Sequence, residues 1–404
     1  MTGKQVIVKN CLYCVMLIML FAGCGKDNIV VSSGGGNPDP TEEWQTTYGG
    51  QRAERLYDLH STSDDGYILT GYTRSNIDSD KDIYLLKTNN VGDELWHSYH
   101  GANNDDEGIG VLPLSGSYVV VGNTCSLDAV NSDIWLGVIS EMDGQGILTA
   151  NYSYGATLID SAFCVLAGLN GEIIIGCTLY DNVASLIAAG IDGQTFWQTE
   201  YQDCQLTCVE KTPDFGYIIA GATNQLDVPA DVVLIKTDSD GNSIWSRQYG
   251  GEGDDRALSV KSTTDNGFIV AGATGSFSQD GNPGDTDIYL FKVNADGDLE
   301  WEHNLGGDLS DIGKDIIQTT DGGFLIVGKT QSYAESADDY NGYVIKTDEN
   351  GDITWQRSIG GNGNDELNCV LQTDGGGYIA AGASRSGYTD WQGWMIFLLP
   401  EPPE

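Results

Sequence analysis

Basic side chains are scarce in this chain: its 404 residues include 19 lysines and arginines against 59 aspartates and glutamates, a formal net charge of −40. Such an acidic chain repels nucleic acid and anionic lipid headgroups, so neither is expected as a partner. Histidine is scarcer still, and its four positions assemble neither a metal triad nor a Ser, His and Asp arrangement. The sequence also has no GxSxG elbow and no phosphate-binding loop. We therefore predict no cofactor, no bound metal and no catalytic residue.

The first 24 residues have the features of an export signal. Lys4 and Lys9 form a positive start, Leu12 to Phe21 is an apolar run, and small residues lead to Cys24. The segment FAGC resembles the lipobox of bacterial lipoproteins, in which Cys24 becomes the lipidated first residue of the mature chain. An ordinary secretory signal or a transmembrane anchor is the alternative, although the apolar run is short for a stable span. We predict a signal peptide over residues 1–23 and an envelope protein that contacts the outer membrane only through its lipid.

Residues 24–43 are rich in Gly, Ser, Pro and Asp, a composition typical of a flexible tether. The mature chain then has 17 basic against 59 acidic side chains, a formal charge of −42. This excess of negative charge favours cations, basic partners or neutral ligands such as glycans. We also expect the tethered part to be a soluble monomer.

Cysteine use gives no disulfide framework and no zinc motif. Two of the nine cysteines, Cys11 and Cys14, leave with the signal and Cys24 carries lipid. The remaining six are Cys125, Cys164, Cys177, Cys204, Cys208 and Cys369. Because their positions do not recur from repeat to repeat, we predict buried free thiols rather than disulfides.

One pattern is spelled seven times along the chain, as in SIWSRQYGGEGDDRALSVKSTTDNGFIVAGATGS. The copies align on a residue four places before a YGG-like turn: Trp44, Trp96, Ala150, Trp197, Trp245, Trp301 and Trp355. Successive anchors are 52, 54, 47, 48, 56 and 54 residues apart, a spacing typical of a propeller, solenoid or array.

Each copy holds four short β-type runs separated by Gly, Asp and Asn clusters. In the fifth copy these are strand A (Ala257 to Ser262), strand B (Phe268 to Ala273), strand C (Asp287 to Val293) and strand D with Trp301. Strand B is a continuous apolar run, which indicates packing on both faces. The sequence thus predicts an all-β fold, a seven-bladed β-propeller of four-stranded blades over residues 44–400.

The two ends of the repeat array are incomplete in complementary ways. The last copy ends after strand C, Trp394 to Leu398, and the strand around Trp44 has no A, B or C before it. Pairing these two strands closes the ring and covers an exposed edge.

The turn and tryptophan in KTDSDGNSIW, Lys236 to Trp245, resemble the tryptophan-docking repeat of quinoprotein-type propellers. The resemblance implies that the tryptophans pack between adjacent blades, and that the contact is weaker where Ala150 replaces the ring, at blades 2 and 3. Quinoprotein dehydrogenases also clamp their cofactor with adjacent cysteines. This chain has none, which argues against quinone chemistry.

An acidic residue recurs five places after the first Gly of the YGG-like turn. The set is Glu54, Asp106, Asp160, Asp255, Asp311 and Asp365, with Thr207 in the fourth copy. Strand A is the innermost strand, so we expect these side chains to form a ring at one channel mouth and to be candidate ligand contacts. The alternative is a scaffold role, in which each carboxylate accepts N–H groups of its own turn or of the next blade. Acidic hairpin turns such as Asp238 to Asn242 are interpreted as turn chemistry rather than calcium loops.

The same face carries the connections between strands B and C, which vary in length from copy to copy. They are residues 74–82, 124–133, 275–287, 331–341 and 384–391. Their aromatic side chains, Phe277, Tyr333, Tyr388 and Trp391, are candidates for stacking on sugars or anchoring a protein. The alternative is that each ring covers its own loop.

Two functions fit these features. The first is a lipid-anchored, non-enzymatic binding or assembly module for a glycan or a protein. The second is a glycosidase or lyase that uses paired carboxylates at the channel mouth. One carboxylate pair with a raised pKa in a deep pocket would favour the enzyme, whereas a regular ring favours binding.

Overall fold

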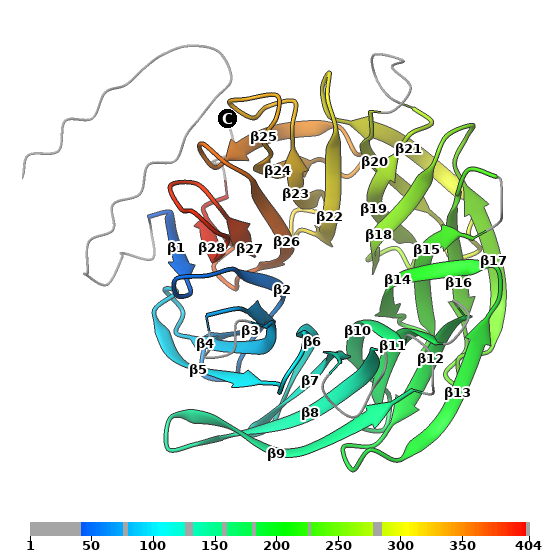
Figure 1. Cartoon of the computed structure of the whole chain (residues 1–404). Coiled ribbons are helices and arrows are strands. Elements are labelled where there is room, and N and C mark those ends of the chain that lie inside the picture. The colour runs from blue at the N-terminus through cyan, green and yellow to red at the C-terminus, as the bar shows by residue number, and fades with distance from the viewer. Residues whose placement is uncertain are drawn as a thin grey trace, which may run out of the picture.

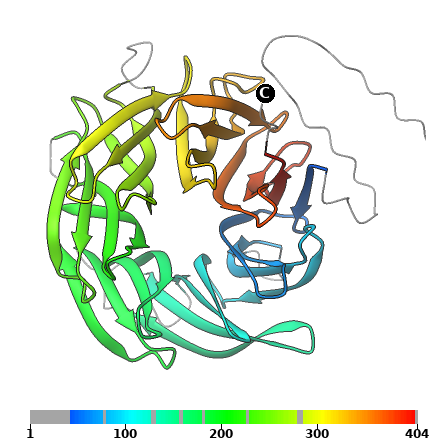
Figure 2. The same cartoon turned by 180° about the vertical axis from the view of Figure 1, so that it is seen from behind.

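The computed structural model of the chain describes residues 42–75, 80–125, 132–155, 160–179, 183–224, 228–277 and 285–400. The predicted signal peptide, Cys24 and nearly all of the tether lie outside these residues. The described part consists of seven four-stranded antiparallel sheets arranged as a ring (Figure 1), which confirms the predicted seven-bladed propeller. Figure 2 shows the same ring from the opposite face. Among the described residues there is no helix that is long and apolar enough to cross a membrane.

The blades are numbered here in the order of their innermost strands. Strand A of blades 1 to 7 is β2 (Glu54–Ser61), β6 (Asp106–Leu114), β10 (Ser161–Ala167), β14 (Cys204–Lys211), β18 (Asp255–Ser262), β22 (Asp311–Gln318) and β26 (Asp365–Gln372). Strand B is β3 (Tyr67–Thr73), β7 (Ser117–Thr124), β11 (Ile173–Leu179), β15 (Tyr217–Thr223), β19 (Phe268–Thr274), β23 (Phe324–Thr330) and β27 (Tyr378–Ser384).

Strand C is β4 (Asp82–Thr88), β8 (Asp133–Met142), β12 (Val183–Ala189), β16 (Val232–Thr237), β20 (Asp287–Val293), β24 (Asn341–Thr347) and β28 (Gln392–Leu398). Strand D is β5 (Glu94–His100), β9 (Gln145–Tyr154), β13 (Thr195–Tyr201), β17 (Ser243–Tyr249), β21 (Leu299–Leu305), β25 (Ile353–Ile359) and β1 (Trp44–Tyr48). Strand D forms the outer rim and strand A faces the channel (Figures 1 and 2).

The ring closes as the incomplete ends predict. β1 pairs antiparallel with β28, with Trp44 opposite Phe397 and Tyr48 opposite Gly393. The Tyr48 hydroxyl donates a hydrogen bond to the carbonyl oxygen of Gly92 in blade 1, at 2.5 Å. The first described strand therefore completes blade 7 and also fastens it to its neighbour.

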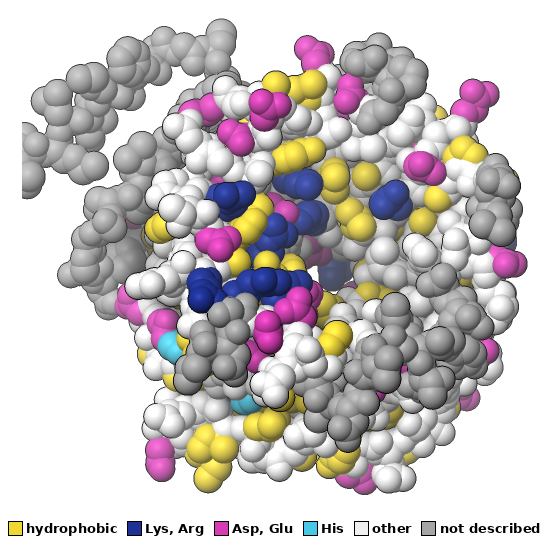
Figure 3. All heavy atoms as spheres, viewed as in Figure 1, with side chains coloured by type: hydrophobic (Ala, Val, Ile, Leu, Met, Phe, Trp, Pro, Cys, Tyr) yellow, Lys and Arg dark blue, Asp and Glu magenta, His cyan; other side chains and the backbone are white. Residues whose placement is uncertain are grey.

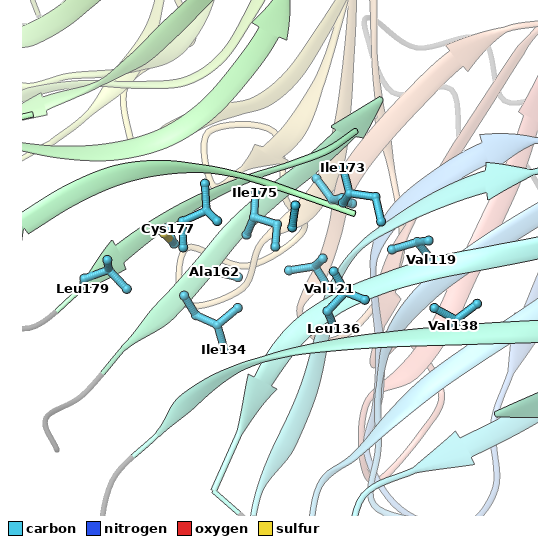
Figure 4. Close-up of a cluster of buried hydrophobic side chains, with 13 residues drawn as sticks. Val119, Val121, Ile134, Leu136, Val138, Ala162, Ile173, Ile175, Cys177 and Leu179 are labelled. Carbon is cyan, nitrogen blue, oxygen red and sulfur yellow. The ribbon is translucent and has the colours of Figure 1, made fainter. Parts of the chain in front are cut away.

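The hydrophobic core lies between the blades rather than within one of them. Every residue of β3, β19 and β27 is buried, so strand B packs on both faces as predicted. Figure 4 shows one such layer, in which Val121 and Leu136 of blade 2 and Ile175 and Cys177 of blade 3 belong to one buried cluster. Each blade thus needs both neighbours to bury its apolar residues, because a single sheet cannot cover its own faces.

The tryptophans on strand D pack against the next blade, as the resemblance implied. A Cβ atom at Gly92 in the turn between strands C and D of blade 1 would lie 2.6 Å from the Trp44 ring. The same relation joins Trp96 to Gly146, Trp197 to Gly241, Trp245 to Gly297 and Trp301 to Gly351. Glycine is needed at Gly92 for a second reason, its φ of +80°.

The contact between blades 2 and 3 keeps an aromatic ring in spite of Ala150. A Cβ at Gly193 of blade 3 would lie 2.4 Å from the ring of Tyr152, two residues after Ala150 on the same face of β9. The tyrosine therefore occupies the place of the missing tryptophan. The predicted weakening of this contact stays a prediction.

Candidate functional site

The connections from D to A and from B to C lie on one face of the ring, because neighbouring strands run antiparallel. Strand A begins, strand B ends and strand C begins at this face. The six recurring acids stand at this end of strand A, but they do not line an open channel mouth. All six are buried, with at most 1% of the residue surface exposed.

The buried acids mostly accept hydrogen bonds from their own turns. Oδ2 of Asp255 accepts from Gly251 N at 2.9 Å and from Ser276 Oγ at 2.6 Å. Asp311 makes the same contacts with Gly307 and Ser332. Asp365 accepts from Gly361 N and from the hydroxyls of Ser384 and Ser386. This is the geometry expected of the scaffold alternative.

Each acid also joins two blades. Its backbone N–H donates to a carbonyl oxygen one or two residues before strand C of the preceding blade, as from Asp255 to Ala230 at 2.6 Å and from Glu54 to Trp391 at 3.0 Å. At Gly250, whose φ is +150°, a Cβ would lie 2.4 Å from Oδ2 of Asp255 and 2.7 Å from Oδ1 of Asp231 in the preceding blade. Carboxylates of two blades meet in the same way at Gly101, Gly155 and Gly306, whereas the preceding blade supplies Asn341 at Gly360 and only Glu54 lies close to Gly49. This crowding explains why the turn begins with Gly.

Burial shifts the titration of several of these groups. Burial raises the pKa of Glu54, Asp311 and Asp365 above the ordinary value of a carboxyl group. Burial, and then the charge of Asp255, raises the pKa of Asp231. Because the arrangement repeats from junction to junction, it is a regular series rather than one distinguished pair in a deep pocket.

The fourth copy requires a correction. The alignment placed Thr207 at the acidic position, but Cys204 stands opposite Thr223, just as Asp255 stands opposite Thr274. The turn of this copy is shorter, so counting from its start moved the alignment by three residues. Thr207 instead donates its hydroxyl to the carbonyl oxygen of Ala257 in the next blade, at 2.8 Å.

The four loop aromatics have different surroundings. The Tyr333 hydroxyl donates to Gly306 O at 3.0 Å, and its ring lies 5.5 Å from that of Tyr343. Phe277 packs on Tyr289 at 5.6 Å. Tyr388 is 47% exposed, and its hydroxyl lies 3.0 Å from that of Thr47. Trp391 differs from the others, because the guanidinium carbon of Arg55 lies over its ring at 3.9 Å.

Basic side chains gather around the central hollow of this face (Figure 3), although the chain as a whole is strongly acidic. At the junction of blades 6, 7 and 1, Glu366 accepts from Arg55 at 3.0 Å and from Lys314 at 2.8 Å. Lys314 also donates to Oδ1 of Asn368 at 2.7 Å. We call Arg55, Lys314, Lys329, Glu366, Asn368 and Trp391 the mouth cluster.

Lys329 is the cation of this cluster that forms no ion pair within the described part of the chain, although the charge of Glu366 partly offsets the repulsion from Lys314. Among the described residues, no Asp or Glu lies within ion-pair distance of its Nζ, which sits 4.3 Å from the centre of the Tyr340 ring. Burial lowers the pKa of Lys329, and the positive charge of Lys314 lowers it further. An incoming anion would relieve this repulsion, whereas a cation would increase it.

Sequence reasoning missed the mouth cluster because the residue type at its repeat positions changes from blade to blade: Arg55 and Glu366 are equivalent, and so are Lys314 and Asn368. Lys314 stands three places after the strand A acid, where blade 1 has Tyr57, and Lys329 stands where blade 1 has Tyr72. A search for recurring residues cannot find such a set. The signal available was the shortage of basic residues, which makes any clustering of them informative.

The channel waist below the mouth encloses a hollow of about 380 Å³ lined by strand A residues of all seven blades. A bulge interrupts every strand A, and the residue directly after it is Asp58, Gly110, Cys164, Cys208, Ser259, Asp315 or Cys369. Three cysteines thus recur at one place, contrary to the expectation that cysteine positions do not recur.

All six cysteines in the described residues are free thiols. Burial raises the pKa of Cys208 to about 12, so this thiol stays protonated at neutral pH. Among the described residues there is no group of three or more His, Cys, Asp or Glu side chains that could hold a metal ion. In the acidic turn, Asp238 accepts from the N–H groups of Asp240 and Asn242, as hairpin chemistry requires.

No protein-family model and no curated protein matches the chain. Solved structures match it over most of its length. The WD40 domain of Pan2 from Neurospora crassa is 10% identical with a TM-score of 0.53, and the match covers 86% of this chain and 90% of that one. Sqt1 from Chaetomium thermophilum is 11% identical with a TM-score of 0.52, covering 83% and 82%. At these identities the likeness shows the fold alone.

Proposed function

We propose that the protein is a lipid-anchored binding module of the bacterial envelope, which holds a glycan or protein ligand at the mouth cluster without turning it over. The observation that carries the proposal is the gathering of cations and aromatic rings at one channel mouth in a chain of net charge −40. Such a concentration of Arg, Lys and Trp side chains is the chemistry of recognition sites. The propeller architecture shared with a WD40 domain is consistent with a binding or assembly role.

Two features support binding rather than turnover. The facing carboxylates belong to repeated, buried blade junctions, and their hydrogen bonds serve the turns. Glu366 lies between Arg55 and Lys314, which hold its pKa below the ordinary value, so it is poorly suited to act as a general acid.

The experiment is an array of glycans and peptides probed with the purified propeller, followed by a reducing-sugar release assay on any glycan that binds. Trp391→Ala removes the ring beside Arg55 but keeps the backbone carbonyl that Glu54 uses. We expect it to abolish the array signal. Lys211→Met, at the opposite end of strand A, is the matched control and should bind normally. Turnover of a bound glycan would overturn the non-enzymatic assignment.

Attachment to the envelope is tested separately. Cys24→Ala should abolish metabolic labelling of the protein with a fatty-acid probe, because Cys24 is the proposed lipidation site. Labelling that persists in this variant would refute the anchor while leaving the binding proposal intact.

A further inference from the structure

We infer that the ligand of the mouth cluster is a sugar acid: a glycan end whose terminal sugar carries one carboxylate. This inference rests on the proposed function and adds the class of ligand. It depends on three properties of the cluster: its uncompensated positive charge, the acidity of the rest of the chain, and the acceptors placed among its cations.

The net positive charge of the mouth cluster favours a negatively charged ligand. Arg55 and Lys314 share the single carboxylate of Glu366, which leaves a local excess of one charge before Lys329 is counted. The side chains of Arg55 and Lys314 remain 26% and 23% exposed, so a ligand can reach them. Arg forms bidentate hydrogen bonds with a carboxylate, and Lys contributes a mobile ammonium group.

The charge of the whole chain limits the size of this anion. An extended polyanion would cross a surface that carries a net −40, and charges within the screening length of about 8 to 10 Å repel each other. A ligand with a single negative charge at its end avoids this repulsion, because only that end enters the positive region. The mouth therefore favours a chain terminus over the middle of a polyanionic chain.

The remaining groups favour a sugar over an acidic peptide. Oxygens of Glu366 and Asn368 stand between the cations, and each carboxylate oxygen accepts more than one hydrogen bond. These acceptors repel a second carboxylate but accept the hydroxyl groups that a sugar carries beside its acid. A neutral sugar is a poorer fit, because it stacks on open aromatic faces and cations lie over Trp391 and Tyr340.

The space below the cluster is large enough for one sugar residue of the ligand. Lys314 and Asn368 also line the hollow of about 380 Å³ at the channel waist. Small-ligand sites are commonly about 300 to 1,000 Å³.

The test uses three probes in calorimetric titrations: an oligosaccharide ending in galacturonic acid, its methyl ester, and a peptide with a free C-terminal carboxylate. The acid should bind at least about tenfold more tightly than the ester, since esterification removes the charge and leaves the hydroxyls. Lys329→Met should weaken binding of the acid by about tenfold, leave the ester unchanged and keep the melting temperature. Lys211→Met should change none of these.

Equal binding of acid and ester, or an unchanged affinity in Lys329→Met, would overturn the inference. Binding of the peptide in place of the sugar acid would overturn the sugar assignment and leave the proposed function standing. Ligand binding at the mouth cluster, the basis of the proposed function, is refuted if array ligands bind and neither Trp391→Ala nor Lys329→Met weakens them.

Discussion

Arg55 and Trp391 come from opposite ends of the described chain, yet the guanidinium carbon of Arg55 lies 3.9 Å from the centre of the Trp391 ring. Arg55 is the second residue of strand A of blade 1, and Trp391 ends the B to C connection of blade 7. The mouth cluster therefore straddles the seam that β1 closes. Formation of the site and closure of the ring are coupled by this geometry.

Deleting residues 42–48 should both lower the melting temperature by many degrees and abolish ligand binding. The deletion removes β1, exposes the edge of β28 and uncovers the core around Trp44 and Tyr48. Deletion of residues 25–40 is the control and should leave the melt unchanged. Differential scanning calorimetry measures the melting temperature of both deletion variants, and a normal melt without β1 would contradict the closure.

The double substitution Asp255→Asn with Asp311→Asn should destabilise the fold and leave ligand affinity of the folded protein unchanged. In each buried carboxylate Oδ2 accepts the hydrogen bonds and Oδ1 has no partner among the described residues, so an asparagine buries an NH2 group without an acceptor. Urea unfolding and titration of the same sample separate the two effects. Lost affinity with an unchanged unfolding curve would instead make these acids ligand contacts.

The contribution of Glu54, Asp311 and Asp365 to stability should rise as the pH falls from neutral toward about 4. Burial raises the folded-state pKa of Glu54, Asp311 and Asp365 above the unfolded value, so the folded protein binds more protons in this window. Their contribution is full below the unfolded pKa and is lost as the pH rises through the folded pKa. In urea unfolding across the window, the wild type should gain stability relative to Asp311→Asn as the pH falls, and a difference that stays constant with pH would disprove this origin.

Gly92→Ala should destabilise the protein more than Gly144→Ala does. Both glycines have positive φ, +80° and +72°, which costs an alanine about 1 to 2 kcal/mol. Only at Gly92 does the new Cβ meet a neighbouring ring, that of Trp44, whereas nothing lies within 4 Å at Gly144. Equal losses in chemical denaturation would show that the tryptophan contact between blades contributes little.

The architecture was predictable because it repeats. Strand C of the fifth copy was bounded correctly at Asp287 and Val293, and β28 begins two residues before the predicted Trp394. Errors arose where a repeat departs from the pattern, as in the short turn that moved Thr207 away from the acidic position.

The site was only partly predictable. The acids recur because the blade junctions need them, and recurrence cannot distinguish a scaffold from a ligand contact. Arg55, Lys314 and Lys329 meet through the closure of the ring, from blades 1 and 6. The residue type at their repeat positions varies: Arg55 matches Arg256 of the fifth copy, but Lys314 and Lys329 match Tyr57 and Tyr72 of the first. Trp391 was identified as a candidate from its loop alone, but its partner Arg55 was not.

The central claim is that ligand binds at the mouth cluster. The most direct measurement compares array binding by the wild-type propeller, the double variant Lys329→Met with Trp391→Ala, and the control Lys211→Met, all with matched melting temperatures. The account predicts that every ligand of the wild type is retained by the control and lost by the double variant. Full binding by the double variant would place the site elsewhere on the protein.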